Sequence, residues 1–81
     1  MNFVEMGIPI GSQLDSIHRE LVAIVLSPKK VLFDNQEISL TAATRQVLGL
    51  EYNVQPSPHW TFQGKHLSDI YHDTYENIGE N

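Results

Sequence analysis

A continuous apolar run, Leu21–Leu26, constrains the fold of this chain more than any other feature of its sequence. Its six residues are far fewer than the roughly 20 that a helix needs to cross a bilayer. The run is short and contains several β-branched residues, which is typical of a central β-strand covered on both faces. The whole chain has 81 residues, so it has room for one domain built around that strand.

Short segments separated by turn residues predict a meander of further strands around this run. Val31–Phe33 follows a turn and closes a hairpin with the run. Asp34 and Asn35 tolerate the left-handed backbone of a tight turn, and Gln36–Ile38 then extends the meander. Gln13–His18 alternates weakly between polar and apolar residues, so it is a candidate first strand.

A helix is predicted between Ser39 and Gly49. The Ser39 hydroxyl suits an N-cap, because it can accept a hydrogen bond from a free N–H group of the first turn. Gly49 suits the left-handed residue that follows a helix. Between them, apolar residues recur at helical spacing and form one face: Leu40, Ala43, Val47 and Leu48.

A further strand and a second helix are predicted towards the C-terminus. Trp60–Gln63 alternates as a short strand, and Gly64 and Lys65 form the turn that follows it. Ser68 is a candidate cap for the second helix, which Gly79 ends. The apolar face of that helix comprises Leu67, Ile70, Tyr71, Thr74 and Ile78.

These elements predict an α+β fold, with a small antiparallel sheet of three to four strands and two helices packed on it. The predicted order is β-β-β-α-β-α. Residues 7–78 form the single domain. Residues 1–6 carry no periodic pattern and are expected to be a flexible N-terminus, and residues 79–81 a tail.

The charge of the chain is unevenly distributed. Ten acidic residues stand against five basic ones, which gives a formal net charge of −5 at pH 7. This balance disfavours unaided binding to bulk duplex DNA, because that affinity comes mainly from Lys and Arg. The last thirteen residues contain four acids and no base: Asp69, Asp73, Glu76 and Glu80.

The chemistry that the composition excludes is broad. There is no cysteine, which removes disulfides, thiolate catalysis and cysteine metal sites. No glycine-rich phosphate loop and no Gly-x-Ser-x-Gly nucleophile motif is present. None of the four histidines has metal-ligand spacing on a predicted helix. We therefore expect a protein that is not an enzyme, with no metal and no cofactor. No signal peptide or membrane span is found, so a cytoplasmic location and no membrane partner are expected.

Candidate ligand-binding residues are aromatic or basic. Trp60 suits a core residue that pins the helices to the sheet, or a platform on which a nucleobase stacks. Tyr52 lies in a proline-bearing loop and is a candidate for an exposed contact. Arg45, on the polar side of the first helix, can join Lys65 and His66 in a patch for phosphates or base edges if these segments lie side by side. The alternative is scattered solubilising charge.

Several of these segments together resemble the RAMA domain, a module named for its association with restriction enzymes and adenine methylases. The resemblance covers about residues 7–76. It rests on the Gly11–Leu14 opening, the Ala23–Leu26 and Val31–Asp34 strands, the helix start at Ser39–Ala43, and the Trp60-x-Phe62-x-Gly64-x-x-Leu67 spacing with Ile70-Tyr71 after it. The residues that match singly are Ser39, Ala43, Trp60, Gly64 and Leu67.

The resemblance implies a non-catalytic, DNA-associated recognition module that senses modified bases in a restriction, modification or defence setting. A second hypothesis is a protein-interaction module or accessory subunit, in which the acidic C-terminal helix faces a basic partner. So small a sheet can also pair with a second copy through an exposed edge strand, giving a homodimer.

Overall fold

The protein is a small α+β domain built on one antiparallel sheet of six strands, in the order β4-β3-β2-β1-β5-β6. The computed structural model describes residues 2–18 and 20–76. The strands are β1 (Gln13–Ser16), β2 (Val22–Ser27), β3 (Lys30–Phe33), β4 (Gln36–Ile38), β5 (Trp60–Phe62) and β6 (Lys65–His66). The class matches the prediction, and the strand count exceeds the three to four expected. β6 was not predicted because two residues are too few to show alternation.

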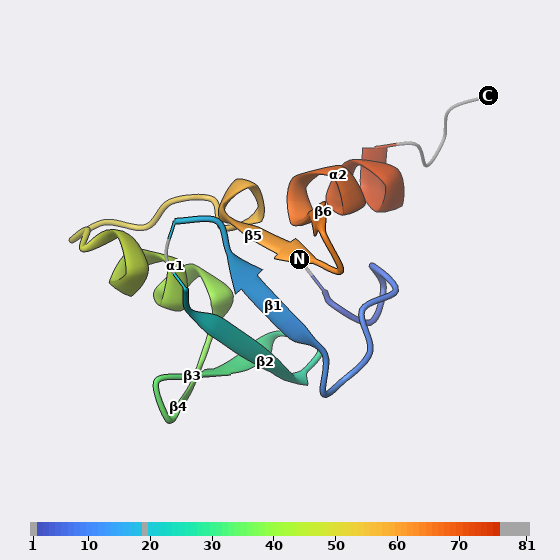
Figure 1. Ribbon diagram of the computed structural model, residues 1–81. Helices are drawn as coiled ribbons and strands as arrows, with labels where there is room; N and C mark the ends of the chain where they lie inside the picture. The colour runs from blue at the N-terminus through green and yellow to red at the C-terminus, as the bar shows by residue number, and fades with distance from the viewer. Residues whose placement is uncertain (1, 19, 77–81) are drawn as a thin grey trace.

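Two helices pack on the sheet. Helix α1 (Leu40–Leu48) lies towards one end of the molecule, and α2 (Leu67–Tyr71) towards the other (Figure 1). A 3-10 turn, η1 (Ser57–His59), precedes β5, and a π-helical turn, η2 (His72–Glu76), continues α2. Among the described residues, no helix is long and apolar enough to cross a membrane.

The caps predicted for the first helix are confirmed. The Ser39 hydroxyl accepts a hydrogen bond from the Ala42 N–H at 3.1 Å. Gly49 has φ 70°, so it adopts the left-handed conformation after the last turn. The second helix differs from its prediction, because it begins at Leu67 with His66 at the N-cap position, and Ser68 lies inside it. Ile78 and Gly79 lie outside the described residues.

The sheet is covered on one face only. Ala23 and Val25 of β2 are fully buried, whereas Val22 and Leu26 are 45% and 38% exposed. Both helices pack against the face that carries Ala23 and Val25. The expectation of a central strand covered on both faces was therefore wrong: β2 is central, but its second face is open. Because every residue of Leu21–Leu26 is apolar, the sequence does not reveal the alternation of buried and more exposed residues that the structure shows along β2.

One hydrophobic core lies between the covered face and the helices. Trp60 is its largest fully buried side chain. The other members are Phe3, Met6, Ile8, Leu14, Ala23, Val25, Val31, Phe33, Leu40, Ala43, Val47 and Leu67.

The N-terminal segment belongs to this core, which differs from the flexible N-terminus expected for residues 1–6. Phe3 is 2% exposed, and its N–H donates to the Pro28 carbonyl at 2.8 Å. The Tyr75 hydroxyl donates to the Glu5 carboxylate at 2.7 Å and accepts from the Asn2 N–H at 3.2 Å. These contacts tie the start of the described chain to the segment after α2.

Candidate functional site

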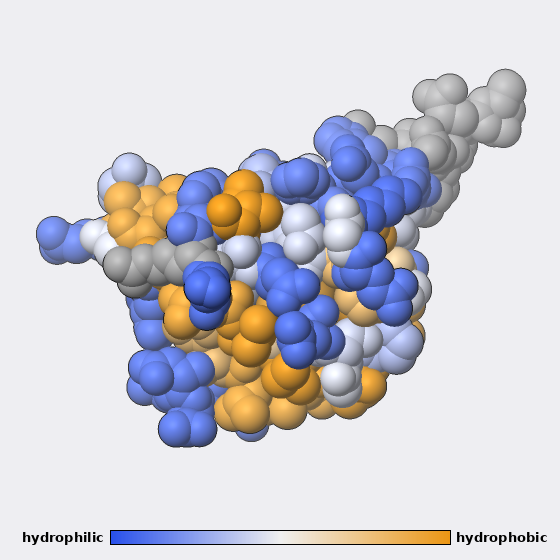
Figure 2. Space-filling model, viewed as in Figure 1, coloured by the Kyte–Doolittle hydropathy of each residue, from blue (hydrophilic) through white to orange (hydrophobic). Residues whose placement is uncertain are grey.

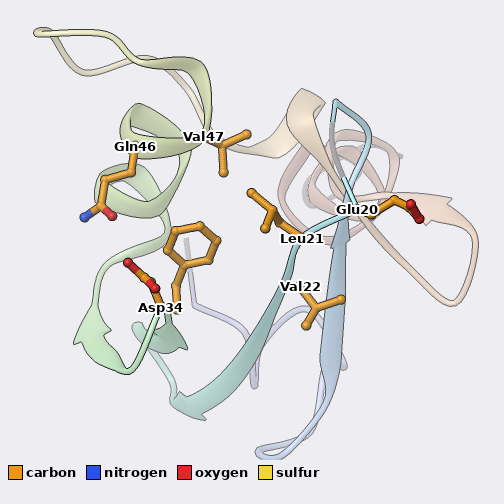
Figure 3. Close-up of a pocket in the computed structure, with 7 residues that line it drawn as sticks. Glu20, Leu21, Val22, Asp34, Gln46 and Val47 are labelled. Atoms are coloured by element: carbon orange, nitrogen blue, oxygen red, sulfur yellow. The ribbon is translucent and has the colours of Figure 1, made fainter.

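One candidate site is a groove of about 460 Å³ beside the start of β2. Its walls come from three parts of the fold: the start of β2, the turn after β3 and the last turn of α1. Its lining residues are Glu20, Leu21, Val22, Phe33, Asp34, Gln46 and Val47 (Figure 3).

The floor of the groove is apolar. Leu21 and Val47 point towards each other, from the chain before β2 and from α1 respectively (Figure 3). Phe33, at the end of β3, is 7% exposed and adds an aromatic ring to the lining. Such a floor can bury an apolar side chain of a ligand, which is favourable in proportion to the apolar area removed from water.

The rim of the groove is acidic. Glu20 and Asp34 are both exposed, and no basic residue belongs to the part of the lining that the structure describes. Asp34 and the amide of Gln46 lie on one side of the groove (Figure 3). Glu20 lies on the other side, and its side chain extends away from Leu21 and Val47 (Figure 3). Neither carboxylate forms an ion pair with any residue that the structure describes. The groove therefore favours a ligand that combines an apolar group with a positive charge.

The open face of the sheet continues the apolar surface from the groove. Val22, which lines the groove, begins a stripe along β2 that includes Ile24 and Leu26. Leu32 of β3 pairs with Ile24 and is 38% exposed, so it widens the stripe. Figure 2 shows hydrophobic residues gathered over this part of the sheet. Exposed apolar surface of this kind marks interaction sites more often than isolated exposed residues do.

Trp60 does not offer a stacking surface, so that role is corrected. It is fully buried in β5, where its indole N–H donates to Thr44 Oγ1 at 2.8 Å. The Thr44 hydroxyl in turn donates to the Leu40 carbonyl at 2.7 Å. The ring of Phe33 meets Trp60 edge-on, with centroids 6.1 Å apart. Of the two interpretations of Trp60, the core residue is the one that fits this burial.

The other predicted site residues lie in two separate places. Tyr52 is 64% exposed in the loop after α1, and Arg45 donates to the Asn53 side chain at 3.2 Å beside it. Lys65 and His66 lie on β6, towards the other end of the molecule (Figure 1). The structure therefore does not bring Arg45 together with Lys65 and His66 in one patch.

Lys65 is engaged with an acidic neighbour. Its ammonium group lies 2.8 Å from the Asp73 carboxylate. This hydrogen bond, with the negative charge of Asp73, raises the pKa of Lys65. The pair is exposed to solvent, so it holds the Lys65 charge near Asp73 and contributes little to stability.

A histidine pair lies at the end of β1. His18 Nε2 and His59 Nδ1 are 2.7 Å apart, and the two ring centroids are 4.9 Å apart. Burial and the neighbouring His18 imidazole lower the pKa of His59. The described residues contain no group of three or more His, Cys, Asp or Glu side chains arranged to hold a metal ion.

Comparison of the chain with protein-family models, curated proteins and solved structures finds no match. The resemblance to the RAMA domain therefore stays a prediction, and the site must be interpreted from its own chemistry.

Sequence reasoning missed the groove, although one local signal pointed to it. Each carboxylate adjoins an apolar residue at the end of an apolar segment: Glu20 precedes Leu21, just before β2, and Asp34 follows Phe33, the last residue of β3. An acid at the end of an apolar strand places a charge beside apolar surface. The sequence alone does not indicate that β2 and β3 bring these two ends to the same side of the fold, next to the last turn of α1.

Proposed function

We propose that this protein is a non-catalytic binding module of the cytoplasm that docks a short segment of a partner protein in the groove. The segment pairs a bulky apolar side chain with an adjacent Lys or Arg. The observation that carries the proposal is the apolar floor of Leu21, Phe33 and Val47 beside the Glu20 and Asp34 carboxylates. The stripe on the open sheet face extends the apolar contact beyond the groove.

Electrostatic complementarity supports a basic segment. The chain carries a net charge of −5, and long-range attraction from an acidic protein speeds the encounter with a basic partner. The surface used differs from the acidic C-terminal helix in the sequence-based hypothesis, because Asp73 of that region is already paired with Lys65.

DNA recognition, which the resemblance implies, has less support from the geometry. The described basic residues lie on separate elements: Lys29 and Lys30 at the β2–β3 turn, Arg45 on α1 and Lys65 on β6. Trp60 is buried, so base stacking would fall to Tyr52. The test of the proposal therefore includes a measurement of binding to duplex DNA, which checks the alternative of DNA recognition.

Selection of random twelve-residue peptides displayed on phage tests the proposal without assuming a sequence. We expect selected peptides to share an aromatic or aliphatic residue next to Lys or Arg. Their affinity, measured by fluorescence anisotropy, should fall roughly tenfold in the double variant Glu20→Gln, Asp34→Asn, since each exposed ion pair contributes up to about 1 kcal/mol. Asn tolerates the φ of 53° at position 34, so the turn is preserved.

Glu51→Gln is the matched control, because it removes one negative charge from an exposed loop outside the groove lining. It should leave peptide affinity within about twofold of the wild type, because an exposed charge outside the lining makes no direct contact with a peptide in the groove and is weakened by salt screening. Selected peptides that lack basic residues, or that bind the double variant as well as the wild type, would contradict the proposal. Binding of unmodified or N6-methyladenine duplexes at physiological salt, with no peptide selected, would overturn it in favour of DNA recognition.

A further inference from the structure

The histidine pair at the end of β1 has the features of a small metal chelate. His18 and His59 are 41 positions apart in the chain, yet their rings form a hydrogen bond, with His18 Nε2 and His59 Nδ1 2.7 Å apart. His18 is exposed and His59 is half-buried, so an ion can reach both from solvent. Neutral imidazole is the commonest metal ligand among protein side chains.

The backbone around the pair is fixed by hydrogen bonds. The Ile17 N–H donates to the His59 carbonyl at 3.1 Å, which links the two segments directly. On the His18 side, the His18 N–H donates to the Ser16 hydroxyl at 3.1 Å. On the other side, the His59 N–H donates to the Pro56 carbonyl at 2.9 Å. The backbone at both histidines is thus held in place before a ligand arrives, so little backbone entropy is lost on binding.

The spacing of the nitrogens suits two neighbouring positions of a coordination shell. Metal–nitrogen bonds of about 2.0–2.1 Å place two ligand atoms about 2.9 Å apart at a right angle and about 3.3 Å apart in a tetrahedron. The observed 2.7 Å is closer to the right-angled arrangement, which is the geometry that Cu²⁺ and Ni²⁺ prefer. A small side-chain rotation supplies the remaining separation. Without an ion, one of the two facing nitrogens carries the proton of their hydrogen bond. An ion binds when that ring takes its other tautomer, so that the protons of the two neutral rings sit on His18 Nδ1 and His59 Nε2 and both facing nitrogens coordinate.

We propose that His18 and His59 form a two-imidazole chelate for a divalent late transition-metal ion. Cu²⁺ is the strongest binder, in keeping with the general order of affinities for nitrogen ligands. The two side chains supply half of a four-coordinate shell, and water completes it. The site is independent of the proposed groove, since neither histidine belongs to the groove lining.

Titration of the untagged protein with Cu²⁺ tests this chelate, and Trp60 provides the signal. Trp60 follows His59 directly and is the only tryptophan in the sequence, so bound Cu²⁺ should quench its emission with a stoichiometry of one ion per chain. Electron paramagnetic resonance of the saturated complex should show two nitrogen ligands. Zn²⁺, which is diamagnetic, should shift the backbone amide signals of the segments that carry the two histidines in an NMR titration.

His18→Gln and His59→Gln should each weaken Cu²⁺ binding at least about tenfold, because the second ligand of a chelate binds at a high effective concentration. The double variant should bind no more weakly than about the weaker single variant. His66→Gln is the matched control, since His66 is an exposed histidine on β6, and it should bind like the wild type. Equal affinity of His18→Gln, His59→Gln and the wild type would overturn the proposal, as would the absence of saturable binding at one ion per chain.

Discussion

At the scale of single residues, the contact between Trp60 and Thr44 is the most specific feature of the core. Thr44 is fully buried, and its hydroxyl accepts from the indole N–H and donates to the Leu40 carbonyl. Thr44→Val keeps the side-chain volume but removes that hydroxyl, so it leaves the indole N–H buried without a partner. We expect a loss of about 1–3 kcal/mol in the free energy of unfolding, measured by urea unfolding monitored through Trp60 emission.

Thr41→Val is the control for this change, because it makes the same substitution on the same helix at a half-buried position without a side-chain hydrogen bond to a described residue. It should stay within about 0.5 kcal/mol of the wild type. If both variants lose the same free energy, the cost is common to any threonine-to-valine change on this helix, and the indole hydrogen bond contributes nothing measurable.

Individual residues also show how far the sequence predicts the site. Tyr52 is exposed, as its place in a proline-bearing loop indicates. Thr44 was not predicted to be buried, because threonine is usually exposed, and only the partner 16 positions away explains its burial. The histidine pair was invisible for the same reason, since 41 positions separate its members. Contacts between distant segments depend on the sheet order, which local patterns do not encode.

At the scale of elements, two hairpins turn through residues with positive φ. Asp34 and Asn35 have φ of 53° and 61° between β3 and β4, and Gln63 and Gly64 have φ of 53° and 83° between β5 and β6. Two-residue turns of this kind match the right-handed twist of the strands that they join. The turn at Asp34 and Asn35 was predicted, because these residue types tolerate left-handed backbone.

Substitution of Asn35 tests that turn. Asn35→Val places a β-branched residue at φ 61°, and we expect a loss of roughly 1–2 kcal/mol in the free energy of unfolding. Asn35→Gly should unfold at the wild-type urea concentration or slightly above it, because glycine adopts positive φ without steric cost. A valine variant as stable as the glycine variant would show that the hairpin forms another turn. Asn35 is not part of the groove lining, so peptide binding serves as a check that the fold is retained.

The elements that the sequence predicted well are those with local signals. Ser39 and Gly49 mark both ends of α1 by side-chain chemistry and by backbone freedom, and both are confirmed. The start of α2 was misplaced. Ser68 is a good cap by type, but the helix begins at Leu67, which is fully buried, and His66 takes the N-cap position without a side-chain hydrogen bond.

At the scale of the whole molecule, the one-sided sheet leaves apolar surface next to an acidic rim. The edge strands β4 and β6 have only three and two residues, so they offer few backbone groups for pairing with a second copy. Homodimerisation through an edge therefore has less support than docking on the groove and the stripe. A partner that covers the open face would bury more apolar surface than one that pairs with an edge strand.

The net charge of the molecule leads to a last prediction, on salt. Ten acids and five bases leave a net charge of −5, and Lys65–Asp73 is the single ion pair among the described residues. Repulsion among the acidic side chains of the folded protein should therefore exceed the attraction between oppositely charged side chains. Raising NaCl from about 0.01 M to about 0.1 M shortens the Debye length from about 30 Å to about 10 Å, so the thermal midpoint should rise. The variant Glu37→Gln, Glu51→Gln removes two exposed charges and should show a smaller rise. A midpoint that falls with added salt would mean that attractive charge pairs dominate the folded state.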